Sequence, residues 1–566
     1  MTPDTSDSAA LIDLSEVLIP VLPKALAIKL AAGLERLLLL NRVNDIQEKI
    51  GGSPTPSAYY REALNALRIS YDLSDGDRGK IPSQGPLVVV ANHPFGGVEG
   101  IILADLLSSV RRDVKILGNR LLHHIPDLRE TVIPVDLSSN KDAVHRNGPA
   151  LRRLLAWLHQ GGALITFPSG TVSHFHLRQG KISDPPWSPH IAALARKTDA
   201  RVLPVYIPGH NSLLFQCFGL VHPYLRTLWL GRELIQGMSR KIPLCVGRPI
   251  APGRLARFDT DAECSAYLRF ATYFIGHRLN PQRTIVPFKL PRPGVGRKAP
   301  AKIPLPALLL AHSDPKAARK AEIDELHPNQ CLHRHNEFAV YLARAQQIPQ
   351  TLQEIGRMRE FTFRAVGEGT GKAQDLDRFD AYYQHLILWD GKAHEIAGAY
   401  RLGEVQAIVA ERGLAGLYTY SLFKFSPAFL ETLGPALELG RAFIPPRYQR
   451  KFGCLPLLWR GIGAFIAGNP DLRNLFGPVS ITQDYTLISR DLMIQYLRCN
   501  RRGPRYAGLV TPRTPVRSRP FQDFKRPLKL FKIHAIEDLS RLVSEIESDG
   551  KGIPVLMKHY LNLNAE

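Results

Sequence analysis

A histidine and an acid flank a glycine-rich turn that directly follows a run of aliphatic residues. The run VVVA leads into Asn92 and His93, Gly96 and Gly97 come next, and Glu99 opens an apolar helical pattern. Glycine lets the chain turn sharply, which would expose the imidazole at the carboxyl end of a strand, where α/β folds keep their sites. An imidazole oriented by a carboxylate can take a proton from a hydroxyl group. The spacing therefore favours His93 as a general base with Glu99 as its partner, although a lone turn histidine is more often structural.

Two later segments favour the catalytic interpretation. LITFPSGTVS (residues 164–173) is a strand-like run entering a Pro-Ser-Gly-Thr turn, and VLPVYIPGHNS (202–212) is another that ends in a glycine turn. In this order the three segments resemble the glycerolipid (lysophospholipid) acyltransferase family, whose blocks are Asn-His-(four residues)-Asp, Phe-Pro-Glu-Gly-Thr and a Val-Pro-Val strand. The resemblance covers roughly residues 15–280. It implies that His93 deprotonates an acceptor hydroxyl as it attacks an acyl thioester.

The same resemblance implies a set of substrate-binding residues. Backbone amides near Gly170 and Thr171 would receive the acceptor or the oxyanion. Arg120 lies where the family uses an arginine for phosphate, with Arg178 and Lys181 as further basic candidates or as solvated surface charges. The predicted substrate-binding residues of this half are Asn92, Gly96, Gly97, Arg120, Phe167, Pro168, Ser169, Gly170 and Thr171.

Two departures from the family pattern affect the predicted acceptor. The acid stands six residues after His93 rather than five, and Ser169 replaces the glutamate of the second block. In the family that glutamate helps to bind the acceptor. The variant therefore resembles the branch that acylates hydroxyl groups of aminolipids rather than ordinary lysophosphatidic acid.

A second group of residues lies in PALELGRAFIPPRYQRKFGCLPLLWRGIGAFI (435–466), a strand, a basic loop and a helix. Amides at a helix start beside arginines suit a phosphate group. The loop resembles the pyrophosphate loop of GNAT acyltransferases: Arg450 and Gly453 fit, whereas Leu455 replaces the final small residue. That replacement suits a branch that takes acyl groups from acyl carrier protein rather than a standard coenzyme A site.

The wider match, over about residues 335–566, is to hemolysin-like GNAT proteins, the ornithine lipid N-acyltransferases. It implies that a neutral α-amine attacks a thioester held beside split central strands. Glu438 would accept the amine proton, directly or through water, and Arg441 would pair with the carboxylate of the amino acid. An alternative is that Glu438 and Arg441 simply pair with each other.

The elements that must position these residues fall into two patterns. Between residues 86 and 250, strand-like runs alternate with helical stretches at 99–110, 142–160 and 188–197, which predicts an α/β domain whose sheet is covered on both faces. The second half predicts helices at 337–344, at 352–366 and from Leu455. Between them, alternating runs predict a mostly antiparallel sheet with strands at 382–390, 395–403, 416–425 and 436–444. The predicted fold class is thus α/β, with a glycerolipid-acyltransferase-like domain followed by a GNAT-like α+β domain.

Composition suggests the domain limits. We expect amphipathic helices at residues 1–50, the O-acyltransferase domain at 51–280, a Pro/Lys-rich linker at 281–325 and the GNAT-like domain at 326–566. Residues 18–41 could lie on a membrane surface or pack on their own domain, and no run reaches the ~20 apolar residues needed to span a bilayer.

The formal net charge of +22 predicts an anionic partner. Anionic lipid and acyl carrier protein fit better than nucleic acid, because the aromatic-interleaved patterns of RNA-binding modules are missing. GEGTGK at residues 367–372 does not match a nucleotide-binding loop, and the histidine and cysteine groups lack zinc-site spacing, so we expect no metal.

Together the two halves resemble a bifunctional ornithine lipid synthase. The C-terminal half would join a 3-hydroxyacyl group from acyl carrier protein, or coenzyme A, to an amino acid. The N-terminal half would then esterify the 3-hydroxyl of this lyso-aminolipid. The expected location is peripheral, at the cytoplasmic face of a bacterial inner membrane. A phospholipid-remodelling acyltransferase with a regulatory GNAT half and a membrane-perturbing, hemolysin-like protein are the alternatives.

Overall fold

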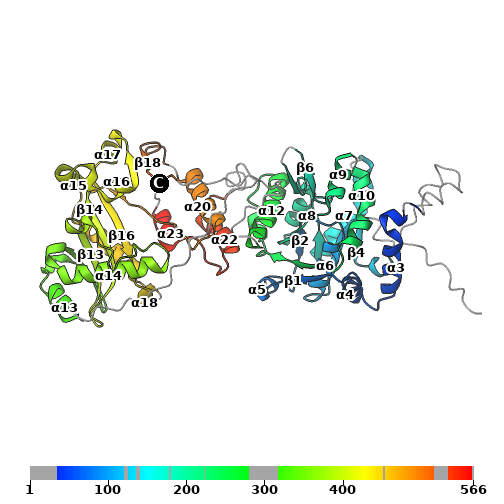
Figure 1. Ribbon diagram of the computed structural model, residues 1–566, viewed down its shortest axis with the longest axis horizontal. Helices are drawn as coiled ribbons and strands as arrows, with labels where there is room; N and C mark the ends of the chain where they lie inside the picture. Colours follow the sequence, from blue (N-terminus) through cyan, green and yellow to red (C-terminus); the bar gives the residue numbers. More distant parts are fainter. Residues whose placement is uncertain are drawn as a thin grey trace, which may run out of the picture. The chain divides into compact units, whose positions relative to one another are not determined.

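The structure is a computed structural model that divides into two compact units (Figure 1). The first unit comprises residues 1–294 and 521–552, and the second comprises residues 295–520 and 553–566. The chain therefore passes between the units three times. The structure describes residues 33, 35–119, 125–135, 141–177, 180–221, 223–279, 316–449, 453–501, 503–515 and 533–563.

The first unit is built on a six-stranded sheet in the order β10-β8-β2-β5-β3-β4. Neighbouring strands are parallel except for β10, which is antiparallel to β8. The central strand is fully buried and consists only of aliphatic residues, as expected for a strand covered on both faces. The strands are β2 (Leu87–Ala91), β3 (Val114–Asn119), β4 (Val132–Val135), β5 (Ala163–Thr166), β8 (Arg201–Tyr206) and β10 (Cys245–Val246).

Helices cover both faces of this sheet, which confirms the predicted α/β domain. On one face, α4 (Pro56–Ala66) and α6 (Val98–Ser108) share a core with Leu87 and Val89. On the other, α12 (Asp261–Ile275) contacts β2 and β8 and packs against α8 (Pro189–Lys197). Further elements of this unit are α3 (Leu40–Ile50), β1 (Ser70–Asp72), α5 (Asp75–Arg78), α7 (Lys141–His159), β6 (His174–His176), β7 (Lys181–Ser183), α9 (Leu213–Val221), α10 (Pro223–Gln236), β9 (Lys241–Pro243) and α11 (Pro252–Leu255).

The helix α22 (Ile536–Ile546) belongs to the first unit, although we expected residues 326–566 to form one GNAT-like domain. Asp538 lies 2.9 Å from Nη1 of Arg257, and Glu545 accepts a hydrogen bond of 3.1 Å from the amide of Arg248. The apolar face of α22 is buried as well. An amphipathic helix is typical of either domain, so its sequence pattern does not reveal which core it covers.

The second unit contains a six-stranded sheet in the order β11-β12-β13-β14-β16-β17. All neighbouring pairs are antiparallel except β16 and β17, which run parallel. This confirms the predicted, mostly antiparallel sheet. The strands are β11 (Cys331–His335), β12 (Phe338–Arg344), β13 (Gln384–Asp390), β14 (Glu395–Glu404), β16 (Ala436–Phe443) and β17 (Asn474–Phe476).

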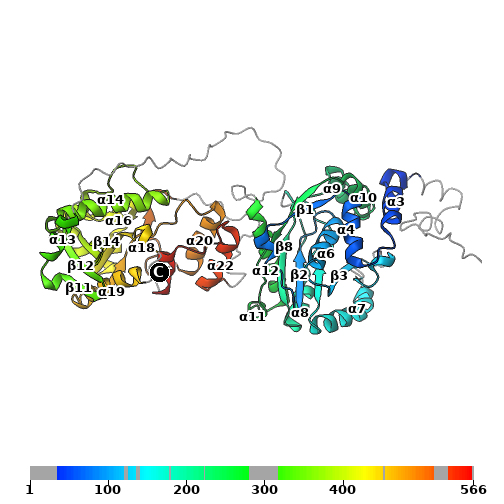
Figure 2. The same cartoon turned by 90° about the horizontal axis from the view of Figure 1, so that it is seen from below.

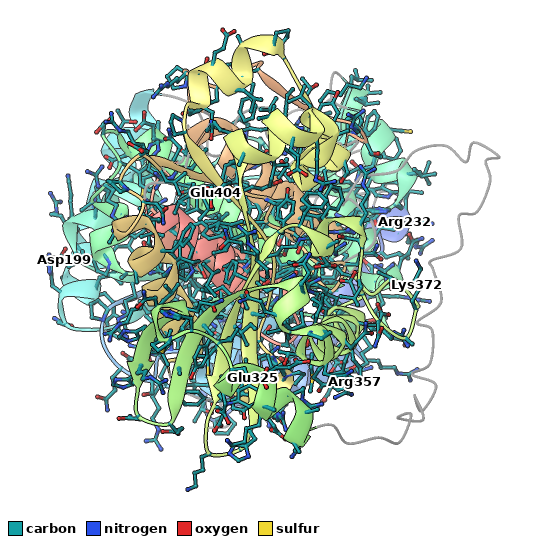
Figure 3. The ribbon with its side chains drawn as sticks, turned by 90° about the vertical axis from the view of Figure 1, so that its left-hand side faces the viewer. Asp199, Arg232, Glu325, Arg357, Lys372 and Glu404 are labelled. Carbon is teal, nitrogen blue, oxygen red and sulfur yellow. The ribbon has the colours of Figure 1, made fainter. Side chains whose placement is uncertain are left out.

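Two long helices cover opposite faces of this sheet (Figure 2). Residues of α19 (Cys454–Ala467) share one core with Val340 and Leu386, and Ile355 of α14 (Pro349–Ala365) shares the other with Tyr341 and Ile387. Outside the cores, Glu325 and Lys372 lie at the surface of this unit (Figure 3). The remaining elements of this unit are α13 (Lys316–Asp324), α15 (Val405–Arg412), α16 (Tyr418–Leu422), β15 (Phe423–Phe425), α17 (Pro427–Leu433), α18 (Pro446–Gln449), α20 (Leu487–Asn500), β18 (Val510–Pro512) and α23 (Val555–Asn562).

Two predicted elements of this half are wrong. Residues 337–344, expected to be helical, form strand β12, which pairs with β13 along its whole length. Residues 416–425, expected to be a strand, contain the helix α16, and only β15 is extended. In both cases contacts with distant parts of the chain override a short and ambiguous local pattern.

The expected linker and N-terminal segments lie mostly outside the described residues. Of the linker at 281–325, the structure describes residues 316–325, where α13 is a helix that packs against α14. Of residues 18–41, only Gly33 and residues 35–41 are described. Among the described residues, none of the helices combines the length and apolar character that crossing a membrane requires.

Candidate active sites

His93 and Glu99 form the centre of the first candidate site. Nδ1 of His93 lies 2.7 Å from Oε1 of Glu99, and the glutamate side chain is fully buried whereas the histidine is 17% exposed. The turn after β2 thus presents the imidazole at the edge of solvent while its partner stays inside the protein. This is the geometry predicted for a general base and the acid that orients it.

Three backbone amides fix the carboxylate of Glu99. It accepts hydrogen bonds of 3.0 Å from the amides of Phe95 and Gly96 and of 3.2 Å from the amide of Gly97. Gly96 has a φ of 96°, and a Cβ there would lie 2.6 Å from the side chain of Leu230, so both backbone conformation and space require glycine. The tight turn explains how an acid six residues after the histidine still reaches it.

The electrostatics of the pair favour a charged complex. Burial acts to lower the pKa of His93, but the charge and the hydrogen bond of Glu99 outweigh it and raise that pKa above 6.5. Burial likewise acts to raise the pKa of Glu99, and His93 together with the turn amides outweighs it and lowers that pKa. Glu99 therefore stays ionised and stabilises an imidazolium on His93.

The predicted Phe-Pro-Ser-Gly-Thr turn lies beside the histidine. The ring of Phe167 stacks on the imidazole with centroids 4.5 Å apart, and the carbonyl of His93 accepts a hydrogen bond of 2.7 Å from the amide of Ser173. The amide of Gly170 donates to the carbonyl of Phe167 at 3.0 Å, so the turn itself uses that amide. The hydroxyl of Ser169 donates to the carbonyl of Thr171 at 2.8 Å. The carbonyl of Pro168 accepts from the amide of Ser188 at 2.8 Å.

The other residues predicted to bind substrate do not all lie beside His93. The side-chain amide of Asn92 donates to the carbonyl of Ile207 at 2.7 Å and accepts from its amide at 2.8 Å, which ties the ends of β2 and β8 together. Asn92 therefore supports the turn from within the core. Lys181 lies on β7. Arg120 and Arg178 lie outside the described residues.

Asp184 is a site residue that the sequence analysis missed. Its buried carboxylate accepts a hydrogen bond of 3.2 Å from the amide of His93 and further bonds from the hydroxyl of Ser173 and the indole of Trp187. The backbone amide of Asp184 donates a hydrogen bond of 2.9 Å to the hydroxyl oxygen of Tyr273. The acid stands 91 residues after the histidine that it supports, so local spacing gave no signal.

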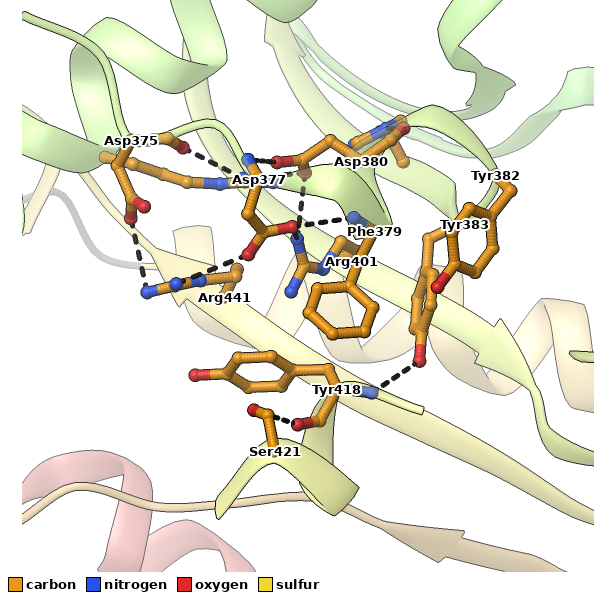
Figure 4. A network of polar contacts seen from close by, with 12 residues as sticks. Asp375, Asp377, Phe379, Asp380, Tyr382, Tyr383, Arg401, Tyr418, Ser421 and Arg441 are labelled. Carbon is orange, nitrogen blue, oxygen red and sulfur yellow. Dashed lines mark hydrogen bonds and ion pairs between the residues drawn. The ribbon is translucent and has the colours of Figure 1, made fainter. Parts of the chain in front are cut away.

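The second candidate site is a buried network of arginines and aspartates in the second unit (Figure 4). Arg401 of β14 lies 2.5 Å from Asp377 and 3.1 Å from Asp380, with no exposed side-chain surface. Asp380 also pairs with the equally buried Arg359 at 2.8 Å. Burial acts to raise the pKa of Asp380, but Arg359 and Arg401 outweigh it and lower that pKa. Complementary charges thus compensate the desolvation of this network.

Arg441 is the arginine of this network that a ligand can reach. Its side chain is 22% exposed, and it lies 3.3 Å from Asp375 and 3.4 Å from Asp377 (Figure 4). It has a φ of 49° and stands where the pairing of β14 with β16 shifts register, at a β-bulge. The bulge turns its side chain toward the aspartates. The alternative pairing of Glu438 with Arg441 is therefore wrong.

Glu438 is fully buried, and its carboxylate accepts several hydrogen bonds. It accepts hydrogen bonds from the hydroxyl of Tyr383, from the amide of Thr419 at 2.6 Å and from the amide of Tyr418 at 3.3 Å. These amides open α16, so Glu438 caps that helix from a neighbouring strand. The ring of Tyr418 then packs under the guanidinium groups of Arg401 and Arg441, at 4.9 and 5.1 Å.

The pairing of β16 with the edge strand β17 ends at Glu438, where β17 itself ends. The paired register of β16 and β17 ends at Glu438 and Phe476, while β16 continues to Phe443. A Cβ at Gly477, just after β17, would lie 2.1 Å from the carbonyl oxygen of Leu439, so glycine is needed where the chain passes this close to β16. Gly453, with a φ of 106°, is the N-cap residue of α19, and its role in a phosphate loop stays a prediction; Arg450 lies outside the described residues.

The GEGTGK segment binds a carboxylate of the protein itself. Glu360 accepts hydrogen bonds from the amide of Thr370 at 2.8 Å and the amide of Gly371 at 2.9 Å, so this glycine loop already holds an anion. Within the described ranges, no group of three or more His, Cys, Asp or Glu side chains is placed to hold a metal ion.

Comparison with protein families gives two matches that fit the two units. An acyltransferase family model matches residues 36–281, and the acetyltransferase (GNAT) domain model matches residues 358–460. A lysophosphatidic acid acyltransferase, PlsC, of Thermotoga maritima is a solved structure similar to part of the chain, at 20% identity, 41% of this chain, 78% of that chain and a TM-score of 0.26.

Two curated proteins of Phocaeicola vulgatus are similar to parts of the chain. Its lyso-glycine lipid O-acyltransferase is 26% identical over 34% of this chain and 69% of that protein. Its glycine N(alpha)-acyltransferase is 36% identical over 41% of this chain and 72% of that protein. The protein is accordingly an acyltransferase with an acyltransferase domain and a GNAT domain, and it belongs to the family of the glycine N(alpha)-acyltransferase.

Proposed function

We propose that the chain is a bifunctional aminolipid synthase. The GNAT domain acylates the α-amine of an amino acid with a 3-hydroxyacyl group, and the N-terminal domain esterifies the resulting 3-hydroxyl. The observation that carries the proposal is the His93–Glu99 pair, 2.7 Å apart, on the same chain as a GNAT domain. Relatives named for the two successive steps support it. One chain that holds both activities raises the local concentration of the intermediate.

In the esterification step His93 acts as the general base. Its Nε2 takes the proton of the 3-hydroxyl as that oxygen attacks the carbonyl carbon of the acyl thioester. The new C–O bond forms, the C–S bond breaks, and the imidazolium returns the proton to the leaving thiolate. Glu99 holds Nδ1–H and stabilises the imidazolium, while the stacked Phe167 fixes the plane of the ring.

In the amide-forming step Arg441 receives the carboxylate of the amino acid. It is the exposed arginine of the network, and the bulge, Asp375 and Asp377 fix its guanidinium. The neutral amine attacks the thioester, a C–N bond forms, the C–S bond breaks, and the proton lost by the amine passes to the leaving thiolate. We assign Glu438 a positioning role, in place of the base that we expected, because its carboxylate is buried and holds α16 and Tyr418 under Arg441.

We propose acyl carrier protein as the acyl donor, on the strength of Leu455 in the first turn of α19 and the charge of +22. Ornithine is the amino acid that the resemblance favours. Glycine is the second candidate, because both relatives carry glycine in their names. We place the enzyme peripherally at the cytoplasmic face of a bacterial inner membrane, where lyso-lipid collects.

The test is lipid mass spectrometry on a bacterial host that lacks aminolipids and expresses the chain with ornithine or glycine supplied. We expect a diacyl aminolipid from the unchanged chain, accumulation of the monoacyl form with His93→Ala, and a marked loss of both with Arg441→Ala. Arg357→Ala, a surface arginine paired with Glu354, is the matched control and should leave both lipids unchanged. Well-expressed chain that yields no aminolipid would contradict the proposal.

A further inference from the structure

The helix α9 exposes a face that is entirely apolar. Leu213, Leu214, Cys217, Leu220 and Val221 are exposed, with exposed fractions from 48% for Leu220 to 76% for Val221 among the aliphatic residues. Their spacing of three, four and seven residues places them on one side of the helix. The opposite side is buried through Phe215 and Gln216. A surface helix normally presents polar groups to water, so this orientation is inverted.

The neighbouring helix α10 extends the same surface. Leu225 and Leu228 are 40% and 46% exposed, and α9 and α10 pack against each other as a pair (Figures 1 and 2). A Cβ at Gly219 would lie 3.2 Å from the side chain of Arg226, so glycine permits this close approach. Leu37, 52% exposed, continues the surface beside α10, where its carbonyl accepts a hydrogen bond from Arg232. We call Leu37, Leu213, Leu214, Leu220, Val221, Leu225 and Leu228 the leucine face.

The charges of the helix pair fit a surface that meets lipid. The single acid of α9 and α10, Glu233, is buried and accepts hydrogen bonds from the amide and the hydroxyl of Ser212. The arginines of α10 make contacts within the unit: Arg226 packs against Gly219, and Arg232 lies over Trp229 at 5.2 Å and donates a hydrogen bond to the carbonyl of Leu37. Exposed apolar surface without an acid is what an interfacial helix presents to a bilayer.

The helix pair is joined directly to the His93 turn. The side chain of Leu230 lies against Gly96, and Asn211, just before α9, donates a hydrogen bond of 3.2 Å to the carbonyl of Phe95. The amide of Phe95 in turn binds the carboxylate of Glu99. The leucine face and the catalytic pair are therefore held by the same few turns of the chain.

We propose that the leucine face of α9 and α10 docks on the surface of a lipid bilayer and presents the His93 site to acceptor lipid in that bilayer. The choice of a bilayer rests on the proposed function, because a lyso-aminolipid acceptor lies in a membrane. It also rests on the continuity of the face with the His93 turn. A second copy of the chain on this face is the competing occupant.

The test uses the full chain and vesicles of phosphatidylethanolamine and phosphatidylglycerol. Cys217 and Cys499 are the exposed cysteines, so an environment-sensitive fluorophore on Cys217 in a Cys499→Ser background reports the polarity at α9. We expect a blue shift on vesicle addition. Leu214→Asp with Val221→Asp should weaken vesicle binding at least tenfold, while esterification of lyso-lipid dispersed in detergent stays within twofold. Leu151→Asp on α7, at a residue 47% exposed, is the matched control and should bind vesicles normally.

Several results would overturn the docking proposal. One is full vesicle binding by the double aspartate variant. Another is a dimer in solution, free of lipid, that the same variant converts to monomer, because this would assign the face to a second copy. Absence of esterification in detergent by the unchanged chain would contradict the proposed function instead, and vesicle binding would then still test the docking surface on its own.

Discussion

The two candidate sites differ in how many parts of the chain build them. The His93–Glu99 pair comes from the turn after β2 and the first turn of α6, and three amides of the turn after β2 hold the acid. The arginine–aspartate network takes Arg359 from a helix, its aspartates from a loop and the 3-10 turn that follows it, and Arg401 and Arg441 from two strands. A local site tolerates changes elsewhere, whereas a distributed site depends on the packing of the whole unit. The difference predicts that mutations in the first site remove chemistry, and that mutations in the second also remove stability.

The largest effect is expected for His93→Gln in purified enzyme. Loss of the general base should slow esterification of lyso-lipid by on the order of 10²–10⁴-fold. Acylation of the amino acid should stay within twofold, because the network of the second unit does not include this residue. Separate assays of the two steps measure this contrast. His190→Gln, an exposed histidine on α8, is the control, and equal losses in both steps for His93→Gln would break the distinction between the sites.

Arg401→Met should instead destabilise the second unit. Removing one partner of a buried ion pair leaves its carboxylates uncompensated, which costs about 3–5 kcal/mol. Hydrogen exchange should show the loss in amides of β13 and β14, with β2 of the first unit as the internal reference. Lys320→Met removes an exposed ion pair on α13 and should change exchange little. Faster exchange in β2 to the same extent would show that the effect is not confined to the second unit.

A buried histidine should make the stability of the second unit depend on pH. Burial lowers the pKa of His385 from 6.5 to about 4, and its Nε2 lies 2.9 Å from the carbonyl oxygen of Asp380. The folded state therefore binds fewer protons than the unfolded chain, so stability is fully present above pH 6.5 and falls as the pH drops toward 4. The difference corresponds to about 3 kcal/mol. Urea unfolding between pH 7 and 4.5 measures it, and His385→Gln should flatten the slope; an unchanged slope would assign it to carboxylates.

The smallest effect sharpens the role of the acid in the first site. Glu99 raises the pKa of His93, and the base must be neutral to act, so esterification should increase with pH through a value above 6.5. Glu99→Gln removes the charge. The rise of the esterification rate with pH, which is the acid limb of the profile, should then move to lower pH, and the maximal rate should also fall. The pH profile of kcat/KM measures the shift. An acid limb that stays in place would mean that Glu99 does not act through the imidazole.

The contrast between the sites also explains what could be predicted from sequence. The β2 strand, the turn and Glu99 lie within a few residues of one another, so their geometry follows from local rules. Helix α16 could not be predicted, because Glu438, on a strand 19 residues further on, caps its amides. Asp184 escaped notice for the same reason, since it supports His93 from 91 residues away. The pattern EFAVYLAR suits a helix or a strand by composition, and pairing with β13 decides it.

The return of α22 to the first unit bears on how the protein is made. The described part of the first unit otherwise ends at Leu279, and α22 begins at Ile536. The ribosome therefore synthesises nearly the whole second unit before it releases the helix that covers Arg254 and Arg257. At typical translation rates this delay is on the order of 10–50 s, long enough for most domains to fold. The N-terminal domain thus completes its surface only after most of the second unit has been synthesised, and nascent chains truncated at the linker would carry it without that helix.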